Sequence, residues 1–303
     1  MSRLSDAVAA VEHVVLGKPA QVRMCIACLL ARGHLLIEDV PGVGKTTLAH
    51  ALAQVLGLQW RRLQFTSDLL PADVVGVSIF DRATQQFQFR PGPVFTQLLL
   101  ADEINRASPK AQSALLEAME ERQVSIDGVT HALPEPFFVV ATQNPHEQLG
   151  TFGLPESQLD RFLMRVTLGY PDRQSERALL QGGERRELLA STAAVLAPAE
   201  LLAAQRAARA VYVGSPLLDY VQALVAHTRA NCKLGFSPRA AQGLVRAAQA
   251  WALLAGDRAV IPEHVQAVLS SVAAHRLAPR DGDGHVQAEQ LAEELIGAVP
   301  VPV

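Results

Sequence analysis

The stretch "HLLIEDVPGVGKTTLA", residues 34–49, decides the fold of this chain. It starts with an apolar run of strand length, and "TTLAHALAQVLG" after the loop has helical spacing. Between the two, residues 39–46 have the length and the terminal Gly-Lys-Thr of the phosphate-binding loop G-x-x-x-x-G-K-[ST], with Asp39 in place of its first glycine. A strand, this loop and a helix in that order predict a nucleotide site.

Each part of the phosphate-binding loop has an expected task. Backbone N–H groups of the loop and of the helix N-terminus should face the phosphates, which Lys45 neutralises, while the Thr46 hydroxyl coordinates Mg²⁺. Gly42 and Gly44 allow close backbone approach, so we expect Asp39 to be tolerated with its carboxylate turned away. The residues expected to contact the nucleotide are Pro41, Gly42, Val43, Gly44, Lys45, Thr46 and Thr47.

Four more apolar runs have the length of buried strands, and helical patterns separate most of them. This alternation predicts an α/β fold, in which a parallel five-stranded sheet carries helices on both faces. The four runs are residues 61–65, 97–103, 136–143 and 161–168.

Two further segments, residues 77–95 and 123–135, alternate apolar and polar residues on both sides of a turn. Both are typical of β-hairpins inserted into the layered core. They could carry working contacts, or they could only protect a sheet edge.

The chain divides by composition into a nucleotide-binding αβα domain at residues 1–171, a linker at 172–197 and a helical domain at 198–303. After about residue 171 the chain is rich in alanine and leucine and shows no run typical of a strand. Serine at the N-cap and proline at the first helical position predict helix starts, here at Pro198, Ser215-Pro216 and Ser237-Pro238, with another at Pro262. The segment 171–191 is expected to be a helix followed by a mobile link.

The rest of the nucleotide site is expected at the ends of the next strands. Asp102 and Glu103 end the run "LLLADE", where Asp102 would hold Mg²⁺ and Glu103 would orient the attacking water. The alternative is a pair of solvated loop carboxylates. Asn144, in "ATQNP", could position the same water or could simply be a turn residue before proline.

Composition excludes several functions. The net charge is −3 with no long run of lysine or arginine, so nucleic acid is not an expected partner. Asp6 and Glu12 interrupt any signal peptide, and no window offers the roughly eighteen apolar residues of a membrane span, which predicts a cytoplasmic protein. Cys25 and Cys28 form a C-x-x-C within an apolar helical segment, and we expect them to be core residues rather than a redox or zinc site.

Several motifs together resemble the MoxR family of AAA+ ATPases across nearly the whole chain. The resemblance implies an AAA+ nucleotide-binding αβα core with strand order 5-1-4-3-2, a hairpin inserted in the second helix and an all-α lid. The absence of a guanine-reading N-K-x-D motif favours ATP, with Mg²⁺, as cofactor. The motifs are, in order, "RLQFTSDLLPADVVG", "FRPGPVF", "LLLADEINRASPKAQSALLEAMEERQVS", "ATQNP", "LPESQLDRFLM" and "GFSPRA".

The resemblance also implies roles for residues outside the loop. Arg161 is similar to the arginine finger that acts on ATP of a neighbouring subunit, although Arg165 or Arg106 could fill that role, or Arg161 could make an ordinary salt bridge to Asp160 or Glu156. Arg239 is similar to the lid arginine called sensor two and would reach back to phosphate. Val15, Leu16 and Gly17 resemble the segment that lines adenine.

An ATP site completed by a neighbour requires a head-to-tail interface, which closes into a ring, and the resemblance implies a hexamer. The leading hypothesis is a chaperone-like remodeller that matures or activates a client, with a von Willebrand factor A domain protein as the implied partner. The alternatives are a nucleotide-gated scaffold, whose output is assembly, and an ATPase subunit of a metal chelatase. A DNA motor is opposed by the net charge.

Overall fold

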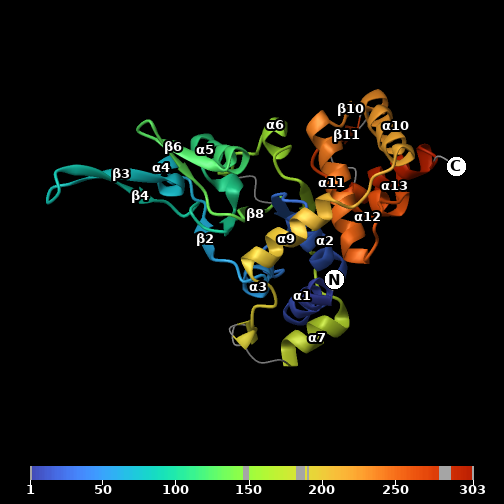
Figure 1. Ribbon diagram of the computed structural model, residues 1–303, viewed down its shortest axis with the longest axis horizontal. Helices are drawn as coiled ribbons and strands as arrows, with labels where there is room; N and C mark the ends of the chain where they lie inside the picture. The colour runs from blue at the N-terminus through green and yellow to red at the C-terminus, as the bar shows by residue number, and fades with distance from the viewer. Residues whose placement is uncertain (1, 146–149, 182–187, 190, 280–287, 302–303) are drawn as a thin grey trace.

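The computed structural model describes residues 2–145, 150–181, 188–189, 191–279 and 288–301. Its centre is a parallel five-stranded sheet in the order β2-β5-β8-β1-β9 (Figure 1). Counted along the chain, these five core strands have the spatial order 5-1-4-3-2, which confirms the expected topology. The strands are β1 (Leu35–Glu38), β2 (Trp60–Gln64), β5 (Leu98–Asp102), β8 (Phe138–Gln143) and β9 (Met164–Val166).

Both faces of the central strands β1, β5 and β8 are buried, which explains why these strands are apolar without alternation. Leu98 and Leu100 of β5 pack in one hydrophobic cluster, whereas Leu99 and Ala101 of the same strand pack in the other. The first cluster is completed by α1 (Ser2–Val14), α2 (Pro19–Leu30), α3 (Lys45–Val55) and the helical domain, and the second by α4 (Pro71–Val75) and α5 (Pro109–Glu121).

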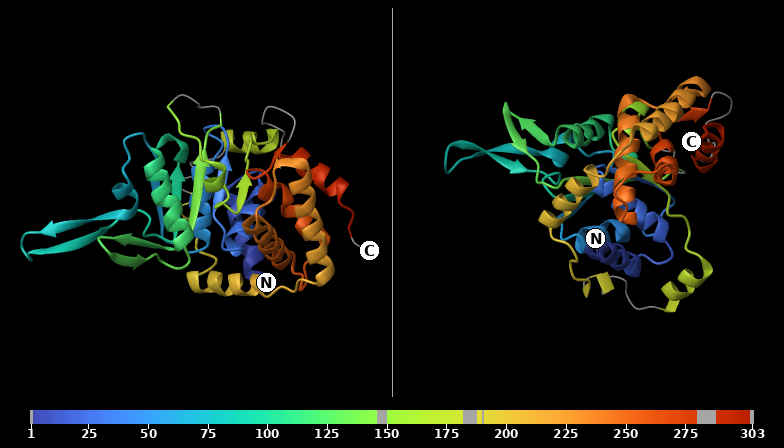
Figure 2. Two further views of the ribbon diagram at one scale, coloured as in Figure 1. Left: turned by 90° about the horizontal axis from the view of Figure 1, so that it is seen from above. Right: turned by 45° about the vertical axis from the view of Figure 1, so that its right-hand side comes forward.

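Both expected hairpins are present. The first is β3 (Gly76–Asp81) with β4 (Gln86–Pro91), directly after α4, and the second is β6 (Gln123–Ile126) with β7 (Val129–Ala132). The first projects far beyond the core, and both lie at the end of the molecule away from the helical domain (Figure 2). Phe89 stacks on His131 at 4.0 Å between ring centroids, so the two hairpins contact each other.

The helical domain contains α9 (Pro198–Arg209), α10 (Ser215–Asn231), α11 (Pro238–Ala255), α12 (Pro262–Ala273) and α13 (Ala288–Ala298). Ser237 caps α11 as predicted, since its hydroxyl accepts from Ala240 N at 3.0 Å. The N-cap of α10 is Gly214, so placing Ser215 there was wrong by one residue.

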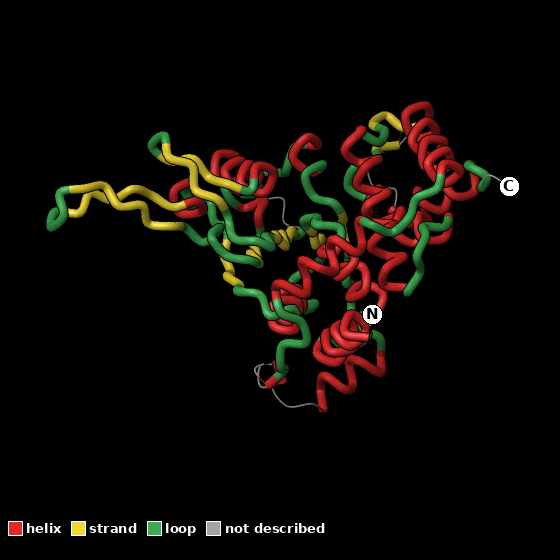
Figure 3. The backbone as a smooth tube through the Cα atoms, viewed as in Figure 1, coloured by secondary structure: helices red, strands yellow, loops and turns green. Residues whose placement is uncertain are grey.

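The expectation of no strand after residue 171 was also wrong. β10 (Cys232–Leu234) pairs antiparallel with β11 (Ala278–Pro279), and Figure 3 shows this small sheet among the helices. Elements of two or three residues are too short to produce a periodic pattern in sequence.

The expected linker is partly ordered against the core. It contains α7 (Arg173–Gln181), and Val195 and Leu196 donate to the Val55 carbonyl at 2.8 and 3.1 Å, at the end of α3. The expected mobile link falls largely on residues 182–187, which lie outside the described residues. The boundaries at 171 and 198 therefore stay predictions. The remaining short elements are a 3-10 turn (Ile104–Arg106) and α6 (Glu156–Leu159).

Within the described ranges, no helix combines the length and apolar character that crossing a membrane requires.

Cys25 and Cys28 are buried free thiols on α2, as expected for core residues. Burial raises the pKa of Cys25 to about 12 and raises that of Cys28 well above its usual range, so both stay protonated at pH 8.

We expect iodoacetamide at pH 8 to leave both cysteines unmodified in the native protein and to modify both in urea, as read by peptide mass spectrometry. Labelling at the rate of an exposed thiol would contradict the core assignment.

Candidate functional site

The phosphate-binding loop joins β1 to α3 at the carboxyl edge of the sheet. Gly42 and Gly44 have φ of 86° and 99°, which L side chains rarely adopt, and a Cβ built at either would meet nothing within 4 Å. Backbone conformation thus requires both glycines, and the loop faces open space there. Lys45 Nζ lies within the loop and donates to the carbonyls of Asp39 at 2.6 Å and Gln143 at 3.3 Å.

The carboxylate of Asp39 points away from the loop interior, as predicted. Its Oδ2 accepts from the backbone N–H of Leu168 at 2.7 Å and of Gly169 at 2.6 Å, directly after β9. Its Oδ1 accepts from Val40 N at 2.8 Å. Asp39 and Leu168 are both buried, so the carboxylate satisfies a backbone donor in the protein interior. The residue in place of the first glycine therefore ties the loop to the end of the neighbouring strand.

Asp102 and Glu103 end β5 on the same edge, and Thr142 of β8 links them. The Thr142 hydroxyl donates to Asp102 Oδ1 at 2.6 Å and accepts from Glu103 N at 2.9 Å. Glu103 has a left-handed backbone with φ of 56°. A non-glycine residue held in this region is uncommon and often functional.

Two side chains of β2 complete this group, and sequence reasoning missed both. Arg62 donates to Asp102 Oδ2 at 2.6 and 3.0 Å, and Gln64 donates to Glu103 Oε2 at 2.8 Å. The strand order contained the signal, because β2 lies beside β5 with Gln64 opposite Asp102. Residues two apart on a strand share a face, which brings Arg62 to the same carboxylates.

Asn144 is buried immediately after β8, between the strands that carry the phosphate-binding loop and Asp102. Residues 146–149 follow it and lie outside the described residues. Its proposed contact with the attacking water stays a prediction.

The segment Val15–Gly17 lies near the same edge. A Cβ on Gly17, whose φ is 69°, would come within 2.4 Å of Ser175 Oγ, and Lys18 Nζ donates to the Tyr170 carbonyl at 2.7 Å. The segment thus packs against residues 170–175, which follow the backbone that Asp39 holds. Its contact with adenine stays a prediction, while its position fits one.

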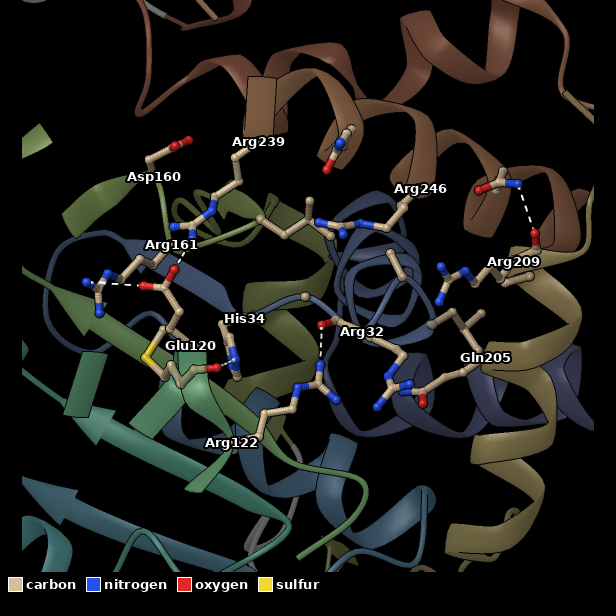
Figure 4. A pocket seen from close by; sticks show the side chains of 18 of the residues that line it. Arg32, His34, Glu120, Arg122, Asp160, Arg161, Gln205, Arg209, Arg239 and Arg246 are labelled. Carbon is tan, nitrogen blue, oxygen red and sulfur yellow. Dashed lines mark hydrogen bonds and ion pairs between the residues drawn. The ribbon is translucent and has the colours of Figure 1, made fainter. Parts of the chain in front are cut away.

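Arg161 and Arg239 lie at the opposite edge of the sheet. Both form ion pairs with Glu120 at the end of α5, and the distance from Arg161 Nη2 to Glu120 Oε2 is 3.2 Å (Figure 4). They line a pocket together with residues 32–34, which precede β1, whereas the phosphate-binding loop follows β1. Glu120 thus holds both arginines at this edge, and the expected reach of Arg239 to phosphate stays a prediction.

The other arginines considered for the finger are engaged elsewhere. Arg106 pairs with Glu103 at 2.8 Å in its own chain's site, and Arg165 pairs with Glu38 at 2.6 Å. Asp160 binds Arg276 at 2.7 Å, so the salt bridge considered between Asp160 and Arg161 was wrong, and Glu120 is the partner of Arg161.

Comparison with known proteins identifies both domains. The family described as "ATPase family associated with various cellular activities (AAA)" matches residues 34–164, and the "AAA lid domain" matches residues 225–295. Chaperone MoxR1 of Mycobacterium tuberculosis is 41% identical over 90% of this chain and 75% of its own length. Protein MoxR of Paracoccus denitrificans is 34% identical over 91% of this chain and 88% of its own length.

One solved structure is similar over the whole chain. It is a protein of Cytophaga hutchinsonii, described as a candidate ATPase, with 33% identity and a TM-score of 0.88 over 100% of this chain and 96% of that one.

The contacts of Asp39 predict that its hydrogen bonds to the backbone after β9, and not its negative charge, stabilise the fold. Asp39→Ala should lower the free energy of unfolding by about 2–4 kcal/mol, because the buried N–H group of Leu168 and the partly buried one of Gly169 lose their acceptor. Asp39→Asn keeps one acceptor oxygen and should lose less than half as much. Urea unfolding measures both, and equal losses for the two variants would contradict the assigned role.

Proposed function

The chain belongs to the MoxR family of AAA+ ATPases and hydrolyses ATP, and from this premise we propose that it works as a head-to-tail ring. Each ATP is held by the phosphate-binding loop of one chain and completed by Arg161 and Arg239 of the next. One observation carries this proposal. Both arginines pair with Glu120 near the amino end of β1, whereas the phosphate-binding loop follows the carboxyl end of that strand.

The residues at the loop fit a bound Mg²⁺–ATP. The loop opens to free space at Gly42 and Gly44, and the N-terminus of α3 faces that space, which favours phosphate. Lys45 would exchange the carbonyls of Asp39 and Gln143 for phosphate oxygens. Bound Mg²⁺ neutralises phosphate charge, and Thr46 with Asp102 would hold it.

Asp102 and Glu103 have distinct environments in this mechanism. Arg62 neutralises Asp102, but its side chain is 49% exposed and can move aside when a cation arrives. Glu103 has an oxygen held by Gln64 and Arg106, which fixes its direction. We assign Glu103 to orient and polarise the attacking water, and Asn144 to position the same water.

The ring follows from the separation of the two halves of the site. One edge of the sheet would meet the opposite edge of a second copy, which is a heterologous contact. Repeated contacts of this kind close into a ring when the rotation between neighbouring chains permits it. The hexamer is proposed from family resemblance. In the single chain Glu120 compensates both arginines, and in the ring a neighbour's phosphate would replace it.

The output we propose is chaperone-like remodelling of a client protein, with a von Willebrand factor A domain protein as partner. One relative is named a chaperone. The first hairpin supplies a candidate contact, because Phe87 and Phe80 are 73% and 46% exposed near its tip and pack edge to face. The cytoplasmic location stays a prediction.

Mixed rings test whether the arginines act between chains. Glu103→Gln and Arg161→Ala should each lower the ATP hydrolysis rate about 100-fold or more, since one loses the water-orienting group and the other the transition-state charge. Mixed in equal amounts, they should recover about a quarter of the wild-type rate per chain, because a random ring contains interfaces with both intact groups. Arg239→Ala should be rescued in the same way.

A mixture of Glu103→Gln with Lys45→Ala is the matched control. Both changes lie in the part of the site that one chain supplies, so no interface regains a complete set and the mixture should stay inactive. An Arg161→Ala mixture that stays equally inactive would show that Arg161 does not act in trans.

A further inference from the structure

Residues 160–163 form the turn between α6 and β9 that carries Arg161, and we call it the arginine turn. Arg276 lies just after α12 and is 6% exposed. Its guanidinium donates to two carbonyls of the arginine turn, that of Leu163 at 3.0 Å and that of Phe162. The helical domain therefore holds the backbone directly after Arg161.

The carboxylate of Asp160 extends this attachment to α11. Its Oδ1 accepts from Arg276 Nε at 2.7 Å, and its Oδ2 accepts from the Ser237 hydroxyl at 2.9 Å. Ser237 is the N-cap of α11, and Arg239 lies in the first turn of that helix. One carboxylate thus connects the turn that carries Arg161 with the helix start that carries Arg239.

Close packing around Leu163 joins the same parts of the chain. A Cβ built on Gly33, shortly before β1, would come within 2.3 Å of the Leu163 side chain, and a Cβ on Gly243 of α11 would come within 2.9 Å. Leu163 therefore fills the space between the start of β1 and α11. In a packed interior of this kind, the arginine turn and α11 have to move together.

The polar groups of Asp160 and Arg276 are used within the chain. Both carboxylate oxygens of Asp160 accept hydrogen bonds. All five N–H donors of the Arg276 guanidinium have acceptors, because it also donates to the carbonyls of Asp160 at 3.2 Å and Val272 at 2.6 Å. These two residues can therefore act on a reaction only by holding other residues in place.

The proposed ring gives this support a task. Glu120 holds Arg161 and Arg239 in the single chain, and a neighbour's phosphate would replace it. The two arginine side chains are 29% and 45% exposed, so their direction then depends on how their backbone is held. A displacement of about 1 Å at a reacting group can lower a rate about 100-fold.

We propose that Asp160 and Arg276 are positioning residues, which fix the arginine turn to the first turn of α11 so that Arg161 and Arg239 are presented to a neighbour's phosphate as one unit. Neither residue touches the nucleotide. The inference rests on the proposed function, because it assigns a task to these residues only if the two arginines act between chains.

The mixture of Glu103→Gln with Arg161→Ala tests this role, because only one kind of interface in it is complete. That interface takes its phosphate-binding loop from the Arg161→Ala chain and its arginines from the Glu103→Gln chain. Asp160→Asn removes the charge of the carboxylate and keeps its shape. The same substitution can therefore be placed on the chain that supplies the arginines or on the chain that supplies the loop.

Asp160→Asn on the Glu103→Gln chain should lower the ATP hydrolysis rate of the mixture about tenfold or more, since the arginines at the complete interface lose their support. On the Arg161→Ala chain it should leave the rate within about twofold. Arg276→Lys should give the same one-sided loss, because an ammonium group keeps the charge but not the planar fork that reaches several acceptors.

Asp257→Asn is the matched control. Asp257 Oδ2 lies 3.0 Å from His264 Nε2, so this change removes the same charge from another contact of the helical domain, away from the arginine turn. It should leave the rate within about twofold on either chain.

The chain on which the loss appears decides the outcome. Equal losses on both chains would show that Asp160 only stabilises the fold, and no loss on either chain would show that the arginines need no such support; both results would overturn the proposal. If thermal unfolding shows that Asp160→Asn is misfolded, Arg276→Lys decides alone. A starting mixture without activity would instead refute the proposed function, and the inference would fall with it.

Discussion

Parallel pairing of β1 with β8 on one side and β9 on the other is the constraint on which the rest of the structure depends. It fixes what lies at each end of β1. The carboxyl end leads into the phosphate-binding loop, and Asp39 holds that loop to the backbone after β9. The amino end lies beside the turn that carries Arg161. One short strand thus separates the nucleotide-holding groups from the arginines that the proposed mechanism requires.

The two edges of the sheet differ in how their charges are balanced. At the carboxyl edge, a basic or amide group from β2 binds the carboxylate of Asp102 and that of Glu103, and Thr142 also binds Asp102. The carboxylates that we propose for catalysis are therefore oriented before nucleotide arrives. At the amino edge, arginines outnumber carboxylates and depend on Glu120. Each edge lacks what the other presents, which is the property expected of a heterologous, head-to-tail assembly.

Local patterns predicted most of the fold, because buried parallel strands, inserted hairpins and capped helices all leave periodic or capping signals. They could not predict contacts between strands that are neighbours only in space. Arg62 and Gln64 lie in the run 61–65, whose expected burial was wrong because β2 is an edge strand with exposed side chains. Their contacts follow only from the position of β2 beside β5. Glu120 likewise looks like a solvated helix residue, and only the folded structure shows that Arg239, in the first turn of α11, pairs with it. The β10–β11 pair was too short to show a pattern.

The central claim is that ATP held by one chain is completed by the next, and solution mass tests it most directly. Size-exclusion light scattering gives the solution mass of the Glu103→Gln variant, which should bind ATP without hydrolysing it, in the presence and in the absence of Mg²⁺–ATP. A shift from the mass of one chain to that of a ring is the predicted result. A chain that binds ATP and keeps the mass of a monomer would contradict the account.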